Sequence, residues 1–424
     1  MAITITDQPY ALTPRGQKLM IIASSDNVAN DGFKYVVNVT DSATSKVYTF
    51  LLAPYNDDLC YYDMQSVVNL ANEETSIDHT AFTQQNEPLG KGINEYIVDI
   101  SEGWIVAGVF TNQGGNASAT IKCINAYYQA TNGYKPNVDN STQPLGFSLS
   151  FTTARAWSDR LPTTHINRNN ISVILPSGTD VIQIPAYDSD YGLLCGARTA
   201  LLSTNTAERV KIEMFNASNV SLASTTIFLS SADMSHVGVY PMNLQDGAPA
   251  VKPSLNPTWA YYEVYYMNSS NTRVSNKYVF YRASMYGAID CKYTPVRLAW
   301  VGSRSGWEYF NFIKKSTKTY QIDRKRYRQV LWNKTTSIFT PSSRGLTEFS
   351  NITKLNYKLT SDWISEGEFT YLKGLLVSKQ VMMFVGTDLV PVIVEDSSYV
   401  QQTTEDGKLY NLELNIQLSN DYWT

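Results

Sequence analysis

Hydrophobic and polar residues alternate with a period of two along most of the chain. The clearest example lies near the C-terminus, where polar residues separate Tyr410, Leu412, Leu414, Ile416 and Leu418. Successive side chains of a β-strand point to opposite faces, so this alternation predicts a strand with one buried face. The preceding run, "SSYVQQTTEDGKLY", contains a second strand pattern and a Glu-Asp-Gly turn. The two strands and this turn predict a β-hairpin.

Several other segments show the same alternation and are separated by turn residues. In "TWAYYEVYYMNSSNTRVSNKYVFYR" two aromatic strands flank a polar loop. The segments "GQKLMIIASS", "FKYVVNVTDSATSKVYTFLLAP" and "RVKIEMFNASNVSLASTTIFLS" fit the same pattern. Short strands with a turn roughly every ten positions are typical of β-sandwiches and small barrels.

Helical signals are few. In "SDWISEGEFTYLKGLLVSK", Ser365 and Glu368 have the spacing of a capping box, and Ile364 can pack against Phe369 as a hydrophobic staple. This pattern predicts a helix over 365–379 that packs on the C-terminal sheet. A second short helix is predicted in "DMQSVVNLAN", capped by Asp63. The predicted fold class is therefore mainly β, with β-sandwich modules and a C-terminal β domain that carries one short helix.

Length and loop composition divide the chain into three predicted domains. A chain of 424 residues exceeds the size that one hydrophobic core usually reaches. The Asn-, Pro- and Gly-rich run "YYQATNGYKPNVDNSTQPLG" predicts a long arm near the end of the first domain. We predict an N-terminal β-sandwich-like domain with a short helix at 1–165, a second sandwich at 166–290, and a basic, aromatic β domain at 291–424.

Charge distinguishes the third domain from the rest. Residues 1–290 contain 17 Lys and Arg against 25 Asp and Glu, whereas 291–424 contain 17 against 13. Between Arg297 and Lys334 ten bases and two acids are interleaved with aromatic residues. This block fits an interface with an acidic surface, a solvated basic face or a nucleic-acid platform. The net charge of −4 on the whole chain disfavours the nucleic-acid reading.

The strands of the basic block are predicted to divide between core and interface. One face is predicted to close the core of the third domain, because a row of exposed aromatic rings would favour association; its candidates are Leu298, Trp300, Trp307 and Tyr309. The bases that follow are predicted to meet an acidic surface of another subunit. These interface candidates are Lys314, Lys315, Lys318, Arg324, Lys325, Arg326 and Arg328.

Signals for catalysis, cofactor binding or metal binding are weak. Three His and four scattered Cys, without a C-x-x-C pair, predict buried free thiols rather than a zinc site. No nucleophile elbow, phosphate-binding loop or zinc-protease motif occurs in the sequence. The pairs Asp188 with Asp190 and Glu395 with Asp396 are expected in turns or at the surface. We therefore predict no catalytic, cofactor or metal residue and no enzyme activity. No export signal or membrane-spanning segment is predicted either.

The central run "CKYTPVRLAWVGSRSGWEYFNFIKKSTKTYQIDRKRY" combines a Cys-x-Tyr entry, two aromatic strands and a basic segment. It resembles tail-associated structural proteins of tailed phages of Bacteroidota, including crAss-like phages. "KLMIIASSDNVANDGFKYVVNV" resembles their opening hairpin, and the segment from "SDWISEGEF" to "LNIQLSND" resembles their C-terminal module, which is similar to distal-tail and hub domains.

The resemblance implies a structural subunit of the virion tail, made in the host cytoplasm. It implies assembly in a ring or hub with other copies of the chain and with other tail or portal-proximal proteins, and passing contact with DNA in the tail lumen. Two other functions stay open. A receptor- or carbohydrate-binding tail module would use Trp259, Tyr261 and Tyr265 as a stacking platform. An envelope depolymerase would use one of the acid pairs.

Overall fold

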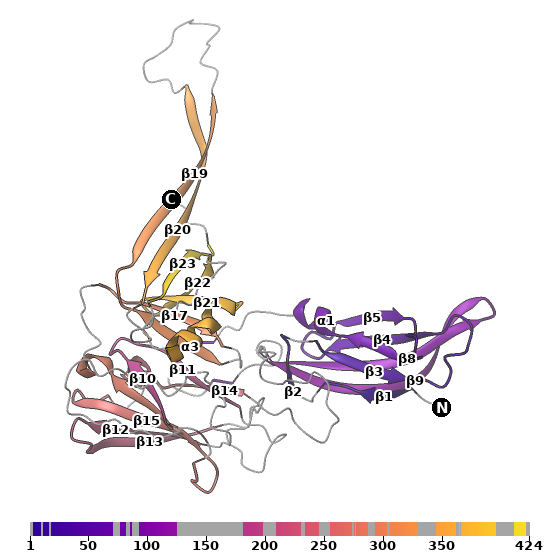
Figure 1. Cartoon of the computed structure of the whole chain (residues 1–424), viewed down its shortest axis with the longest axis horizontal. Coiled ribbons are helices and arrows are strands. Elements are labelled where there is room, and N and C mark those ends of the chain that lie inside the picture. The colour runs from indigo at the N-terminus through magenta and orange to yellow at the C-terminus, as the bar shows by residue number, and fades with distance from the viewer. Residues whose placement is uncertain are drawn as a thin grey trace, which may run out of the picture. The chain divides into compact units, whose positions relative to one another are not determined.

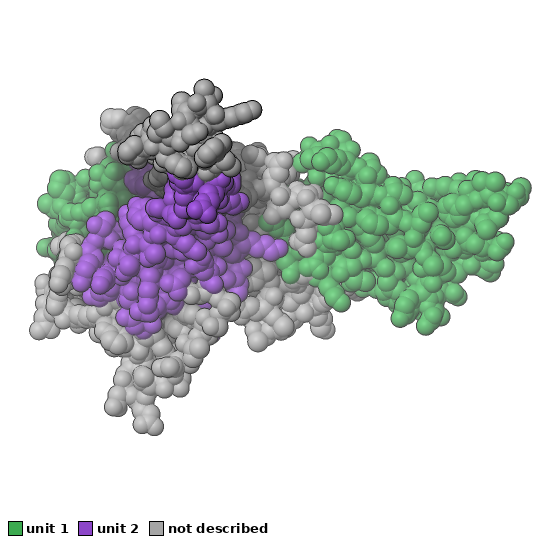
Figure 2. All heavy atoms as spheres, turned by 90° about the horizontal axis from the view of Figure 1, so that it is seen from above, with its two compact units in different colours: residues 1–289, 301–308 green, residues 290–300, 309–424 purple. Residues whose placement is uncertain are grey.

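The structure is a computed structural model of the whole chain. It describes residues 3–9, 12–16, 18–70, 77–81, 85–86, 93–124, 181–197, 209–229, 234–245, 255–273, 275, 277–286, 293–302, 306–328, 345–361, 364, 366–395 and 411–420. These residues are mainly β, as the alternation predicted. The chain divides into two compact units, shown in green and purple in Figure 2: residues 1–289 with 301–308, and residues 290–300 with 309–424.

The N-terminal part of unit 1 is a β-sandwich. Its strands are β1 (Thr4–Asp7), β2 (Leu12–Pro14), β3 (Met20–Ser24), β4 (Lys34–Asp41), β5 (Val47–Leu52), β6 (Cys60–Asp63), β8 (Ile93–Val106) and β9 (Val109–Ile124). They form a five-stranded sheet in the order β2-β9-β8-β4-β5 and a three-stranded sheet in the order β1-β3-β6 (Figure 1). The predicted hairpin of β4 and β5 is confirmed.

The core of this sandwich lies between its two sheets. Alternate residues of β4, such as Tyr35 and Val37, pack in one cluster with Ile21 of β3. The short helix α1 (Gln65–Leu70) adds two valines to the same cluster. The Oδ1 atom of Asp63 accepts hydrogen bonds from the backbone N–H groups of Gln65 (3.1 Å) and Leu19 (3.0 Å). The predicted cap is thus confirmed, and it also ties the helix to the residue that immediately precedes β3.

The second part of unit 1 is another pair of sheets. Its elements are β7 (Gln85–Asn86), β10 (Val181–Ala186), β11 (Leu193–Ala197), β12 (Arg209–Asn216), β13 (Ser221–Phe228), β14 (Met234–Gly238), α2 (Pro241–Gln245), β15 (Trp259–Met267), β16 (Lys277–Arg282) and the 3₁₀ helix η2 (Ala283–Tyr286). The sheet orders are β10-β16-β15-β12-β13 and β11-β14-β7. The predicted hairpins β12–β13 and β15–β16 are confirmed, whereas β10 pairs with β16 in parallel.

Tyrosine hydroxyls connect these two sheets. The hydroxyl of Tyr262 on β15 donates to the carbonyl oxygen of Val239 (2.7 Å), and that of Tyr266 donates to the carbonyl oxygen of Leu194 (3.4 Å). Both phenol rings are buried, so these bonds satisfy hydroxyl groups that burial would otherwise leave without water. The abundant tyrosine of this chain therefore serves packing between sheets here.

A segment of the predicted first domain joins this second pair of sheets. Strand β7 pairs with β14, and the Nδ2 atom of Asn243 donates to the carbonyl oxygens of His79 (2.8 Å) and Ala81 (3.1 Å). A Cβ atom at Gly238 would lie 2.1 Å from the carbonyl oxygen of Ala81, so only glycine fits. No local sequence pattern could predict this link, because His79 and Asn243 are 164 positions apart. The predicted boundary at 165–166 lies outside the described residues.

Unit 2 is built on one seven-stranded sheet. The strands are β17 (Val296–Val301), β18 (Trp307–Phe312), β19 (Thr317–Arg328), β20 (Leu346–Thr360), β21 (Val381–Val385), β22 (Asp388–Val394) and β23 (Glu413–Leu418), in the order β18-β17-β21-β22-β23-β20-β19. Helix α3 (Glu366–Val377) packs on this sheet through Leu372 and Leu375, as predicted. The half-buried C-terminal strand is confirmed as β23, while residues 396–410 of its predicted hairpin lie outside the described residues.

The predicted aromatic face of the basic block needs a correction. The four predicted core residues are all buried, at most 5% exposed: Leu298, Trp300, Trp307 and Tyr309. They do not share one face, however. Leu298 and Trp300 pack in the α3-side cluster with Phe312. The ring of Tyr309 lies instead 4.9 Å from the guanidinium carbon of Arg297 and 6.3 Å from the ring of Phe384. Odd and even positions of β18 face opposite sides, so both faces of this hairpin are covered.

Candidate functional site

Strands β19 and β20 form a long two-stranded ribbon at one edge of the unit 2 sheet. Their Cα partners run from Thr317–Lys358 to Arg328–Leu346, whereas β23 pairs with β20 only over Asn356–Thr360. The ribbon therefore continues past the last strand that supports it, as Figure 1 shows. All 12 residues of β19 are exposed. We call residues 317–328 together with 346–355 the β19–β20 arm.

Apolar side chains lie exposed along this arm. Tyr320 (58% exposed) and Ile322 (45%) are alternate residues of β19, and the cross-strand partner of Tyr320 is the buried core residue Leu355. The apolar face that α3 covers thus continues onto the arm, where Tyr320 and Ile322 remain exposed. Nearer the tip, Phe349 (63% exposed) contacts the ring of Tyr327 at a centroid distance of 6.0 Å.

A register irregularity shapes the outer half of the arm. Lys325 pairs with Ser350 and Arg326 with Glu348, so Phe349 is the extra residue of a β-bulge. Bulges increase the local twist and redirect side chains at sheet edges. Here the bulge lies at Phe349, whose ring is exposed at the surface.

The seven predicted interface bases are all described. Lys314 is half-buried and Lys315 is exposed in the turn before β19, and the other five lie on β19 itself: Lys318, Arg324, Lys325, Arg326 and Arg328. The Nε and Nη2 atoms of Arg326 each lie 2.9 Å from Oε1 of Glu348, and Nη1 of Arg324 lies 3.7 Å from the same oxygen. Within the described part of the chain, Lys315, Lys325 and Arg328 make no ion pair.

The charges of the arm are only partly neutralised. Strand β19 carries five bases, whereas the acids of the arm are Asp323 and Glu348. The Nζ atom of Lys318 lies 5.3 Å from the ring centroid of Tyr357. Charged side chains on an edge strand oppose indiscriminate pairing with other strands. A surface with exposed apolar side chains and excess positive charge is suited to a partner that is apolar and acidic.

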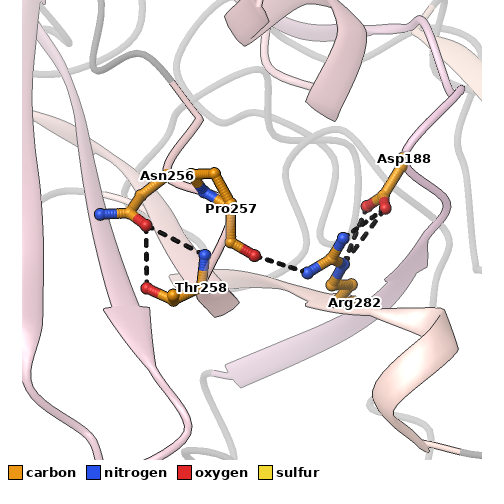
Figure 3. Close-up of polar contacts among 5 residues, drawn as sticks. All are labelled: Asp188, Asn256, Pro257, Thr258 and Arg282. Carbon is orange, nitrogen blue, oxygen red and sulfur yellow. Dashed lines mark hydrogen bonds and ion pairs between the residues drawn. The ribbon is translucent and has the colours of Figure 1, made fainter.

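The acid pair Asp188 and Asp190 lies in the turn after β10, and each carboxylate has its own contacts. The Arg282 guanidinium donates from Nε to Oδ1 of Asp188 (3.0 Å) and from Nη2 to Oδ2 (2.5 Å), and its Nη1 donates to the carbonyl oxygen of Pro257 (2.9 Å) (Figure 3). Asp190 is buried and accepts the backbone N–H of Tyr187 (3.1 Å). The two carboxylates stabilise a turn, and their location in a turn agrees with the prediction from the sequence.

The second acid pair is described only in part. Glu395 is exposed, and its backbone N–H donates to the carbonyl oxygen of Asn415 (2.9 Å). Asp396 lies outside the described residues.

The predicted stacking platform on β15 is wrong. Trp259 and Tyr261 are buried, 0% and 4% exposed, and they lie on different faces of the sheet. Trp259 contacts Tyr262, whereas Tyr261 stacks on Phe215 at 4.9 Å. The cause is a register shift between these two residues of β15, which strict alternation does not reveal. Trp259 and Tyr261 are therefore covered instead of forming a flat exposed surface, and Tyr265, the third ring of the predicted platform, is half-buried.

The described cysteines are structural. Cys60 and Cys123 are free and buried, as predicted, and burial raises the pKa of each thiol to about 12. Such thiols stay protonated at neutral pH and are poor nucleophiles and metal ligands. The Cys195 side chain and Cys291 lie outside the described residues. Among described residues, no group of three or more His, Cys, Asp or Glu is arranged to hold a metal ion.

A concave site of about 620 Å³ lies on the outer face of the β10-β16-β15-β12-β13 sheet, lined by residues that include Lys211, Tyr265 and Lys277. Two acids, Glu213 and Glu263, are direct cross-strand partners next to it. Lys211 lies 3.5 Å from Glu213, and Lys277 lies 2.8 Å from Glu263. Like charges placed opposite each other destabilise a sheet, and the lysines offset that repulsion. A structural role therefore accounts for these cations.

Comparisons with known proteins add no family: no family model matches the chain, and no curated protein matches it. No helix in the described ranges has the length and apolar character needed to cross a membrane. The fold of a single chain does not account for the exposed apolar side chains of the β19–β20 arm, because they gain nothing from contact with water.

Sequence patterns located the bases of this surface but missed two of its parts. The alternation of basic and aromatic residues pointed to the segment that contains β19. Phe349 and Glu348 on β20 were not identified, since their role depends on the pairing register and on the bulge. A usable signal was the mixed polarity of both faces in "LTEFSNITK", which is unlike the clean alternation of the buried strands.

Proposed function

We propose that this chain is a non-enzymatic structural subunit of a bacteriophage virion tail that assembles in a ring or hub. The β19–β20 arm carries the proposal. Its exposed apolar side chains and excess of bases suit contact with other subunits. The subunit is made in the host cytoplasm and resides in the virion, with other copies of itself and other tail or portal-proximal proteins as partners.

The resemblance of the central run to tail-associated structural proteins supports the tail assignment. The residues of that resemblance, "RLAW" and "GWEYFNF", fall largely on β17 and β18, the buried strands next to the arm in the sequence. Such residues determine the fold, so they support a structural resemblance. They do not indicate a catalytic activity. The seven-stranded sheet with its packed helix accords with a hub-like module.

Several candidate residues of the other two functions are engaged within the fold. A carbohydrate-binding module would need exposed rings, but Trp259 and Tyr261 are buried. A depolymerase would need two carboxylates on one substrate, but Asp188 binds Arg282 and Asp190 is buried in its own turn.

The experiment uses a phage whose genome encodes this chain. Virions are purified, and the chain is sought in them by mass spectrometry and by cryo-electron microscopy of the tail. The proposal predicts a fixed number of copies per particle and a ring-like density in the tail. Absence of the chain from purified virions, while infected cells contain it, would overturn the proposal.

An arm variant makes this test specific. Lys325→Glu with Arg328→Glu reverses two bases that make no ion pair among the described residues, so the fold should be kept. We expect virions to lack this variant. The matched control is Lys34→Glu with Lys379→Glu, which changes net charge equally at two exposed bases elsewhere and should be incorporated normally.

A further inference from the structure

The chain carries a second exposed surface whose charge is opposite to that of the arm. Residues 47–63 contain three Asp and no Lys or Arg, and Asp57 and Asp58 are exposed. This stretch includes the edge strand β5, the strand β6 and the loop between them. We call residues 47–63 the β5–β6 corner. Four large apolar side chains are exposed on it: Val47, Leu51, Tyr55 and Tyr61.

The loop of this corner is held in shape by its own contacts. The hydroxyl of Tyr61 donates to Oδ2 of Asp57 (2.6 Å), and the backbone N–H of Leu59 donates to Oδ1 of Asp57 (3.3 Å). The rings of Tyr55 and Tyr61 meet edge to face at 5.6 Å. The Tyr35 hydroxyl donates to the backbone oxygen of Asp58 (2.8 Å). A loop that is already ordered loses little conformational entropy when a partner binds.

Another exposed apolar group serves as a comparison. The turn of the β8–β9 hairpin exposes Ile105, Val106, Val109 and Phe110. However, no charged residue occurs between Glu102 and Lys122. Bases that dock against an uncharged surface lose hydration without gaining a counter-charge. Charge complementarity therefore favours the β5–β6 corner over this turn as the surface that receives the arm.

We propose that the β19–β20 arm of one copy docks on the β5–β6 corner of a second copy. This inference rests on the proposed function, because it names the two surfaces that meet when the subunits assemble. Lys325 and Arg328 face Asp57 and Asp58 of the neighbour, and the exposed aromatic rings of both surfaces pack together. The two surfaces differ, so the contact is heterologous and repeats head to tail, which closes into a ring when the rotation permits.

A charge-exchange experiment tests this docking with the full-length chain. One variant, Lys325→Glu with Arg328→Glu, places two acids at the docking positions of the arm and keeps the acidic corner. The other, Asp57→Asn with Asp58→Lys, replaces the two docking acids of the corner by an amide and a lysine and keeps the basic arm. We expect sedimentation velocity to show self-association of the wild type, and association about tenfold weaker or more for each variant alone. An equimolar mixture should associate again, because each variant then meets an opposite charge.

Folding is checked by thermal melting of each variant. Asp58 has a φ angle of 62°, a conformation that Lys adopts less readily than Asp or Asn. If the double corner variant does not fold, Asp58→Asn replaces it, and the expected result is association several-fold weaker than that of the wild type. The control Lys379→Glu, at an exposed base that belongs to neither surface, should associate as the wild type does.

Three results would overturn the docking inference. They are a wild type that stays monomeric at low salt, folded variants that associate as the wild type does, and a mixture of folded variants that fails to associate. The virion experiment separates this failure from that of the proposed function. A monomeric wild type whose arm variant is still excluded from tails would mean that the arm binds a different tail protein.

Discussion

The two edge strands of the unit 2 sheet both carry aromatic residues but differ in burial. Strand β18, "WEYFNF", is buried along most of its length, whereas β19, "TKTYQIDRKRYR", is exposed at every position. The edge at β18 is also satisfied chemically. The backbone N–H of Tyr309 donates to the hydroxyl of Tyr371 (3.2 Å), and that hydroxyl donates to the Tyr309 carbonyl oxygen (3.3 Å).

The difference shows that alternation identifies a strand but not its burial. Strand β18 carries one charged residue, Glu308, whereas β19 carries five bases and one acid. Burial of so many charges without partners would cost far more than the rings on β19 could return. An edge strand with this composition stays at the surface of the single chain and suits a contact with a charged partner.

The largest effect should come from the core behind β18. Trp300→Ala removes a fully buried ring that packs with α3, and we expect the free energy of unfolding of unit 2 to fall by about 3–5 kcal/mol. Tyr320→Ala on β19 is the matched change at an exposed ring. It should alter the free energy of unfolding by less than about 0.5 kcal/mol. Urea unfolding followed by circular dichroism measures both. Equal losses would contradict the contrast between the two edges.

A smaller effect is expected when the closed edge loses its side-chain partner. Tyr371→Phe keeps the buried ring but removes the hydroxyl that bonds both backbone groups of Tyr309. We expect a loss of about 1–3 kcal/mol, because buried polar groups lose a hydrogen-bond partner. The same urea experiment tests this. A variant as stable as the wild type would show that the hydroxyl does not secure the β18 edge.

The smallest effect should come from the ion pairs of the arm. Glu348→Gln removes the carboxylate that Arg324 and Arg326 approach at the surface. Exposed pairs contribute little, so we expect a change below about 1 kcal/mol, which shrinks further in about 1 M salt. Unfolding measured at low and high salt provides the comparison. A larger loss that persists in high salt would mean that the arm is more tightly built than its exposure indicates.

Local signals in the sequence predicted the elements well. The cap at Asp63, the helix that contains Leu372 and the hairpin of β15 and β16 were all found from patterns a few residues long. The predictions that failed depended on contacts between segments that are distant in the sequence. The faces of Tyr309 and Trp259 were misassigned because strand register and a bulge determine them, and a shift of one residue reverses every side chain.

The candidate surface was predicted in part. The seven bases were recognised from their interleaving with aromatic residues, and the structure places most of them on one exposed strand. The length of the arm, its bulge at Phe349 and the pairing of Glu348 with two arginines follow from the partner strand β20. That these bases meet another subunit stays a prediction.

Amide hydrogen exchange of the two edges, in the free chain and in assembled tails, tests the central claim most directly. The account predicts that peptides of β18 are protected in both states. Peptides of β19 should exchange fast in the free chain, where one side of the strand is open, and slowly in the assembly, where a neighbour covers it. If β19 exchanged equally fast in both states while β18 stayed protected, the arm would not be an assembly surface.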